Sequence, residues 1–148
     1  MPEIKVRIEG ADEVIRALRK VPKDAKVAMR HEAKDIATSL ADFMKADARG
    51  HSRQAARASR SVREANQGFW PVITADNRSK LLFGSVFGMK KHTGWYAFPQ
   101  YRRSTGHQFG EFVGFPGYWF FLSADKRQPW IESEWSKAAD EVVDRWGA

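Results

Sequence analysis

The fold class that this sequence of 148 residues predicts is α+β: an antiparallel sheet of about four to five strands, with a long N-terminal helix and a C-terminal helix packed on it. Three observations lead to this prediction. The chain begins with a strict alternation of apolar and polar residues, continues with a long helical period, and ends with a second helical period after several short apolar runs. The length and the absence of an internal repeat predict a single domain over residues 1–148.

The first half of the chain predicts one strand and two helices. In EIKVRIE, the side chains of Ile4, Val6 and Ile8 fall on one face, which is typical of a half-buried strand. A short helix should follow and end before Pro22. The longest helical pattern covers about residues 23–48, and its apolar stripe consists of Met29, Ala33, Ile36, Ala37, Leu40, Phe43 and Met44. Such a helix is roughly 39 Å long, so we expect part of it to project or to pack on a neighbouring chain.

The second half predicts the rest of the sheet and the final helix. The apolar runs FWPVITA and LLFGSVFG are bounded by Asn, Asp and Gly and should be strands, and YWFFL should be a strand or a buried segment. Pro129 suits the first turn of a helix. The stripe of that helix consists of Ile131, Trp135, Ala138, Val142 and Trp146.

Composition and motifs argue against catalysis and membrane insertion. The chain has no cysteine, which excludes a disulfide, a thiolate zinc site and a cysteine nucleophile. The histidines have no metal-ligand spacing, and no nucleophile-elbow or phosphate-loop motif occurs. No apolar run reaches the roughly 18 residues of a membrane span, and no secretory signal begins the chain. We therefore expect no catalytic residue, metal or cofactor, no membrane partner, and a place in a cytoplasm or in something assembled there.

The net charge of +7 is concentrated in one segment. Between Lys45 and Arg63 there are six basic residues and one acid, Asp47, so this eighth of the chain carries +5. The segment 49–66 is expected to be a basic arm or loop, and its arginines are Arg49, Arg53, Arg57, Arg60 and Arg63. If it is helical, the first four of these form one stripe. Arginine forks bind phosphates without reading base sequence, so contact with double-stranded DNA would be independent of sequence. The alternative is a solvated arm that pairs with acids on a partner.

A second segment, 89–117, is rich in Gly and aromatic residues and has no steady period. A loop of that length in a compact domain is usually functional or an assembly loop. Tryptophans can be stacking platforms for single strands, core residues or interface anchors. We expect an assembly interface here, formed by Trp95, Tyr96, Phe98, Tyr101, Trp119 and Phe121.

The order of these motifs resembles the tail-completion, neck or head–tail connector proteins of long-tailed double-stranded DNA phages, in the version found in phages of actinobacteria. VRIEGADEVIRALRKVPKDAK is similar to the family's opening strand, short helix and start of a long helix. GWYAFPQY resembles a family segment that usually has Glu where Gln100 stands. GYWFFLSADKRQPWIESEW and AADEVVDRW resemble its closing segment. The family's Pro-x-x-Thr-Gly-x-Leu stretch is replaced here by RGHSRQAARASRSV, so nothing about the basic segment is carried over.

The resemblance implies a structural virion protein without enzymatic activity, placed at the head–tail junction. It would form a ring, often of six copies, that joins the tail tube to the head and surrounds the DNA channel. Its partners would be other copies of itself, the neighbouring connector and tail-tube proteins, and the passing duplex. The competing hypothesis is a stand-alone basic protein that contacts nucleic-acid phosphates. A small nuclease is a weaker third hypothesis because no catalytic set converges.

Overall fold

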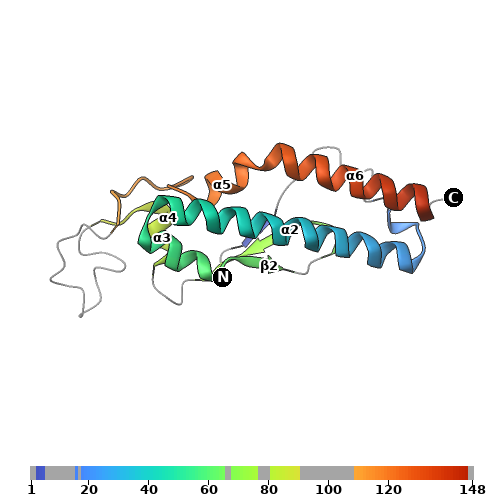
Figure 1. Cartoon of the computed structure of the whole chain (residues 1–148), viewed down its shortest axis with the longest axis horizontal. Coiled ribbons are helices and arrows are strands. Elements are labelled where there is room, and N and C mark those ends of the chain that lie inside the picture. Colours follow the sequence, from blue (N-terminus) through green and yellow to red (C-terminus); the bar gives the residue numbers. More distant parts are fainter. Residues whose placement is uncertain are drawn as a thin grey trace.

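A computed structural model of the chain describes residues 3–5, 16, 18–65, 68–76, 81–90 and 109–146. Its central element is helix α2 (Lys23–His51), which has 29 residues and is therefore about 44 Å long. Helix α6 (Gln128–Trp146) lies along α2, and the short helix α5 (Phe120–Lys126) precedes it (Figure 1). The long N-terminal helix and the C-terminal helix predicted from the sequence are confirmed.

Helix α2 packs on its own chain along its whole length. Its buried residues recur at helical spacing from the first turn to the last, and they are Ala25, Met29, Ala33, Ile36, Ala37, Leu40, Ala41, Met44 and Ala48. They face α6 and α5 on one side and the strands β2 and β3 on another. Of the two expectations for this helix, projection from the domain is therefore wrong, and packing on a neighbouring chain stays a prediction. Phe43 also departs from the predicted stripe, since 38% of it is exposed and it meets Trp130 edge-on.

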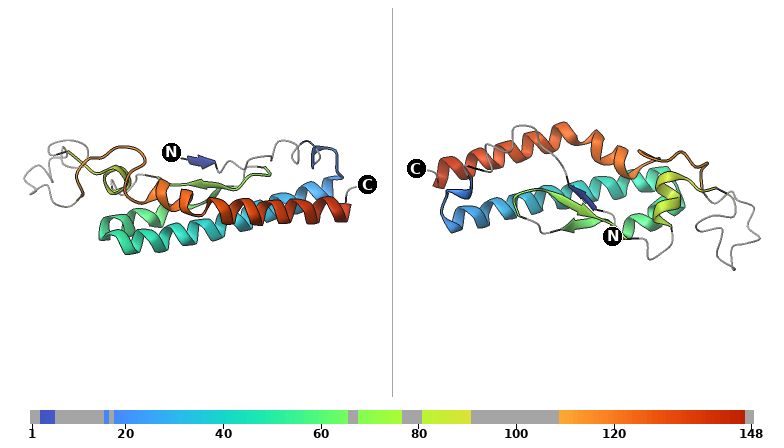
Figure 2. Two further views of the ribbon diagram at one scale, coloured as in Figure 1. Left: turned by 90° about the horizontal axis from the view of Figure 1, so that it is seen from above. Right: turned by 180° about the vertical axis from the view of Figure 1, so that it is seen from behind.

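The sheet is smaller than predicted. In the described residues it has three antiparallel strands in the order β1-β3-β2, namely β1 (Glu3–Lys5), β2 (Arg63–Ala65) and β3 (Val72–Thr74). Figure 2 shows these strands on one face of the pair formed by α2 and α6. The central strand β3 is buried throughout. The mixed helix-and-sheet class is thus correct, and the predicted four to five strands are replaced here by three.

Two apolar runs are short helices: LLFGSVFG was predicted as a strand, and YWFFL as a strand or a buried segment. LLFGSVFG forms α4 (Leu82–Phe87), in which Leu82, Ser85 and Val86 are buried and Phe83 is 44% exposed. YWFFL leads into α5, in which Phe120, Ser123 and Ala124 are buried. Apart from the buried Gly84 in α4, both buried sets have the i, i+3, i+4 spacing of one helix face. Six or seven residues make less than two helical turns, which is too short for the sequence to show this period.

Three tryptophans connect the layers through both ring faces and ring nitrogens. Trp135 Nε1 donates to the Phe69 carbonyl at 2.7 Å, and its ring stacks on Trp70 with centroids 5.7 Å apart. These contacts join α6 to the turn between β2 and β3. Trp119 Nε1 donates to Ser85 Oγ at 3.2 Å and so joins the start of α5 to α4. A buried indole N–H that has a partner adds specificity to the packing.

Candidate nucleic-acid interface

The basic segment begins where Ser52 interrupts the helix. Ser52 has extended backbone angles (φ −163°, ψ 166°), so α2 ends at His51 and helix α3 (Arg53–Ala58) starts in a new direction. The Ser52 hydroxyl accepts a hydrogen bond from the Ala55 N–H at 3.0 Å, which caps the first turn of α3. A 3₁₀ turn, η1 (Ser59–Ser61), continues the chain into β2.

This segment is packed, and the expectation of an arm or loop over 49–66 was wrong for its described residues. Ala55, Ala58, Ser59 and Val62 are all at most 2% exposed. Ser61 fixes the end of η1, since its hydroxyl exchanges hydrogen bonds with the backbone of Asp76 at 3.0 and 3.1 Å. Small residues form the buried side of the segment, and the long arginine side chains are exposed.

The five arginines of this segment are carried by four elements. Arg49 belongs to α2, Arg53 and Arg57 to α3, Arg60 to η1 and Arg63 to β2, and each is exposed. The single helical stripe predicted for the first four does not form, because Ser52 separates Arg49 from the others. We call the set Arg49, Arg53, Arg57, Arg60 and Arg63 the arginine surface. The elements that carry it are fixed by the buried residues and backbone hydrogen bonds described above.

The arginine surface has no counter-ions in the described part of the chain. The ion pairs found there join Arg127 to Asp47 at 3.4 Å and Lys137 to Glu134 at 3.9 Å, and none involves the five arginines. No side-chain hydrogen bond to a described residue restrains them either. Five guanidinium groups are therefore available to an external anion, and guanidinium binds phosphate through two parallel N–H bonds.

Asp47, two residues before Arg49, is already engaged. Its carboxylate accepts a hydrogen bond from Ser123 Oγ at 2.6 Å and from Arg127 Nη2 at 3.4 Å. Burial raises the pKa of Asp47, but the Ser123 hydrogen bond and the Arg127 guanidinium outweigh burial, so this pKa lies below its ordinary value. Asp47 thus remains charged and turned toward α5 rather than toward the arginines.

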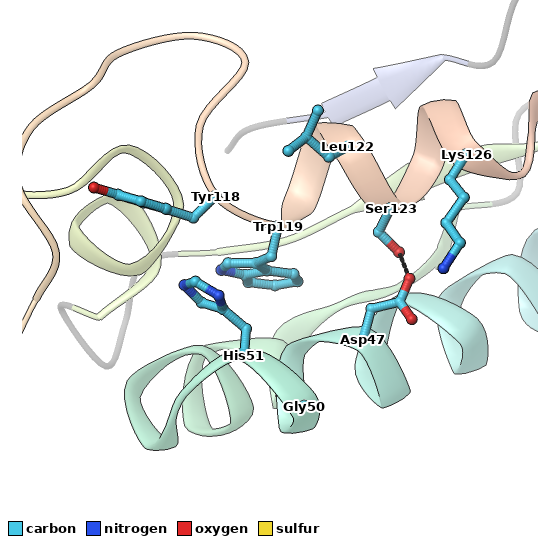
Figure 3. A pocket seen from close by; sticks show the side chains of 8 residues that line it. All are labelled: Asp47, Gly50, His51, Tyr118, Trp119, Leu122, Ser123 and Lys126. Carbon is cyan, nitrogen blue, oxygen red and sulfur yellow. Dashed lines mark hydrogen bonds between the residues drawn. The ribbon is translucent and has the colours of Figure 1, made fainter.

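Beside Asp47 lies an open cavity of ≈ 280 Å³ (Figure 3). Its lining residues are Asp47, Gly50, His51, Tyr118, Trp119, Leu122, Ser123 and Lys126. The His51 ring stacks on Tyr118 with centroids 5.5 Å apart, while the Ser123 hydroxyl donates directly to Asp47. Serine, histidine and aspartate therefore do not form a nucleophile, base and orienting group among the residues that line the cavity. Nor do three or more His, Asp or Glu side chains gather as a metal site anywhere in the described ranges.

The predicted assembly residues fall into three groups. Trp95, Tyr96, Phe98 and Tyr101 lie outside the described residues. Trp119 is 3% exposed and belongs to the core, so its assignment to an interface was wrong. Phe121 is half-buried and packs against Phe115 and Phe87.

The structure adds exposed apolar residues that the sequence did not single out. Phe112, Val113 and Phe115 are 50%, 54% and 74% exposed, and all three fall within the range 89–117 predicted to be an assembly loop. The neighbouring Phe109 is only 8% exposed. No period in this stretch separates its exposed from its buried phenylalanines, so only the structure could do so.

Comparisons with protein-family models, with curated proteins and with solved structures find no match for this chain. Within the described ranges, no helix has the combined length and apolar character that crossing a membrane requires. The functional argument therefore depends on the arginine surface, on the fold that holds it, and on the motif order described above.

Proposed function

We propose that this chain is a structural virion protein of the head–tail junction of a long-tailed phage. Copies of it form a ring that joins the tail tube to the head and surrounds the DNA channel, and the protein works in the virion after assembly in the host cytoplasm. The observation that carries the proposal is the arginine surface: five exposed guanidinium groups with no counter-ion among the described residues. The motif order of the chain supports the same assignment.

The form of the arginine surface suits a channel better than a reader of base sequence. Its residues come from two helices, a 3₁₀ turn and a strand, and no described helix presents all of them to a groove. Sequence-specific readout places a set of side chains on base edges, usually from one element inserted in the major groove. Phosphate contacts alone hold a duplex without selecting a sequence and are weakened by salt. A wall of this kind can face passing DNA of any sequence.

No reacting group is needed for this role. In the cavity beside Asp47, Ser123 donates a hydrogen bond to Asp47 and the His51 ring stacks on Tyr118, so these side chains are not set around an empty reaction centre. The proposal accordingly assigns the protein no enzymatic activity, no cofactor and no metal.

Labelling of particles tests the location. Antibodies against the purified chain should bind virions of the phage that encodes it, and electron microscopy should place the label at the neck. Label confined to the tail tip, or a particle fraction that lacks the chain, would exclude a junction role.

The second candidate is a stand-alone basic protein that binds nucleic acid through phosphates. The same arginine surface favours it, since phosphate contact does not need a ring. The two candidates differ in their partners: the stand-alone protein remains absent from purified virions and binds cellular DNA, whereas the junction protein is a fixed part of the particle. Duplexes of equal length and unrelated sequence should bind with equal affinity in both cases.

A further inference from the structure

We infer that copies of this chain associate head to tail, with the acidic outer face of α6 in one copy set against the arginine surface of the next. The inference deepens the proposed function, on which it rests for the closing of such contacts into a ring. The contact itself is argued from charges that have no partner in the described part of a single copy.

Helix α6 carries the opposite charge to the arginine surface. It has five acids and two bases, a balance of −3. Asp140, Glu141 and Asp144 are exposed, and none of them has an ion pair or side-chain hydrogen bond with a described residue. Asp144 lies four residues from Asp140 and three from Glu141, so the three carboxylates are neighbours on the helix. We call these three residues the acidic face.

The acidic face and the arginine surface lie on opposite sides of the molecule. Helix α2 runs between them, in contact with α6 on one side and with α3 and β2 on the other. Figure 1 shows α6 along the upper edge, toward the C-terminal end, and α3 below α2 at the other end. The view from behind in Figure 2 shows the same separation. The two charged surfaces therefore cannot neutralise each other within one chain, but they can do so between two chains.

Because the two surfaces have opposite charge and lie on opposite sides, each copy would turn its acidic face to one neighbour and its arginine surface to the other. Such a contact is heterologous. Contacts of this type form rings when the rotation closes. Complementary charge also sets the register of the contact and repels wrong pairings, such as one arginine surface against another. A second copy is the partner that the charge pattern identifies, because the same chain provides both surfaces.

The numbers of charges also leave a role for DNA. Five arginines meet three unpaired carboxylates, so two positive charges remain for each contact. Partial neutralisation weakens the grip on a polyanion, which a channel needs if DNA is to move through it. The acidic face of a neighbour thus lowers the affinity of the arginine surface for DNA.

Charge reversal tests the contact. One variant carries D140K, E141K and D144K, and a second carries R53E, R57E and R60E. At low salt the wild type should sediment as an assembly, and each variant alone should sediment as a single chain. An equimolar mixture of the two variants should recover the wild-type mass, because every contact in an alternating assembly is again between opposite charges. Raising the salt should dissociate wild type and mixture alike, since exposed charge pairs are screened.

A matched control distinguishes an effect of net charge from an effect of where the charges lie. The variant with D24K, E32K and D35K has the same net charge as the first variant and changes exposed acids of α2. It should still assemble as the wild type does. Circular dichroism must show native helix content in every variant, and the neutral D140N, E141Q, D144N variant provides a milder test that should weaken assembly at least about tenfold in concentration.

The results distinguish the inference from the proposed function. A wild type that stays a single chain, reversed variants that assemble unchanged, or a mixture that stays dissociated would each overturn the contact. Binding of duplex DNA by the D140N, E141Q, D144N variant is a separate readout, because it keeps all five arginines and adds no lysine. A wild type that assembles but does not bind DNA would leave the contact standing and remove the DNA channel. A wild type that binds DNA but does not assemble would do the opposite.

Discussion

Asp47 joins the end of α2 to α5 through its carboxylate. It accepts hydrogen bonds from Ser123 and Arg127, and the Arg127 guanidinium also lies 4.4 Å from the ring centre of Phe43. We predict that Asp47→Asn lowers the free energy of unfolding by about 1.5–3 kcal/mol, the range for a hydrogen bond to a charged group. Urea unfolding at pH 7 measures the change. Asp42→Asn is the matched control on the same helix; Asp42 is exposed, so an equal loss there would contradict this account.

The same carboxylate predicts how stability depends on pH. Because the pKa of Asp47 is lowered in the folded state, its contribution is present above the ordinary aspartate pKa of about 3.9 and is lost as the pH falls through the lower, folded value. The unfolding free energy of the wild type should therefore fall more steeply below about pH 4 than that of Asp47→Asn. Parallel curves for the two proteins in this window would show that the carboxylate gains nothing from Ser123 and Arg127.

Leu40 tests the buried stripe of α2. It is fully buried, and its replacement by Ala removes apolar contacts and leaves a cavity. We expect Leu40→Ala to reduce the unfolding free energy by about 2–5 kcal/mol. Val27→Ala on the same helix should change it by less than about 0.5 kcal/mol because Val27 is 41% exposed. Similar losses at the two positions would mean that the packing face of α2 has been assigned incorrectly.

At the level of elements, Ser52 determines where the basic segment changes direction. Its hydroxyl caps α3, a helix of only six residues, so the cap is a large part of what stabilises that helix. Ser52→Ala should cost about 0.5–2 kcal/mol in chemical denaturation. Ser136→Ala, at an exposed position inside α6, is the control and should be neutral or slightly stabilising, since Ala favours helix interiors. A neutral Ser52→Ala would show that packing alone fixes the bend.

Long periodic elements could be predicted from sequence and short apolar ones could not. Buried apolar residues recur from Ala25 to Ala48 in α2 and from Ile131 to Val142 in α6, over three turns or more of each helix, which identifies a helix face clearly. In α4 and α5 the same spacing extends over only six and seven residues, which is less than two helical turns. Their helical state is decided by tertiary packing, such as the Phe109 ring placed 2.9 Å from where a Cβ on Gly84 would stand. Sequence pattern does not contain that contact.

At the level of the molecule, the residues of the candidate site could be predicted from the sequence, but their arrangement in space could not. The sequence located the five arginines and the excess of charge. That Ser52 would break their helical spacing, that small residues would anchor the segment, and that no described acid would pair with the arginines follow only from the three-dimensional arrangement. Trp119 shows the converse, since its sequence position beside an aromatic loop suggested an interface and its Nε1 hydrogen bond to Ser85 places it in the core.

The salt dependence of duplex DNA binding tests the central claim most directly, namely that the arginine surface contacts phosphates. The logarithm of the binding constant should fall linearly with the logarithm of salt concentration, with a slope of about 0.9 for each phosphate contact. The R53A, R57A, R60A variant should lower affinity equally for unrelated sequences and reduce the slope by about 2–3 units. The control variant K20A, K23A, K34A removes the same charge from exposed positions elsewhere and should keep most of the slope. An unchanged slope in the arginine variant, or an equal reduction in both, would contradict the account.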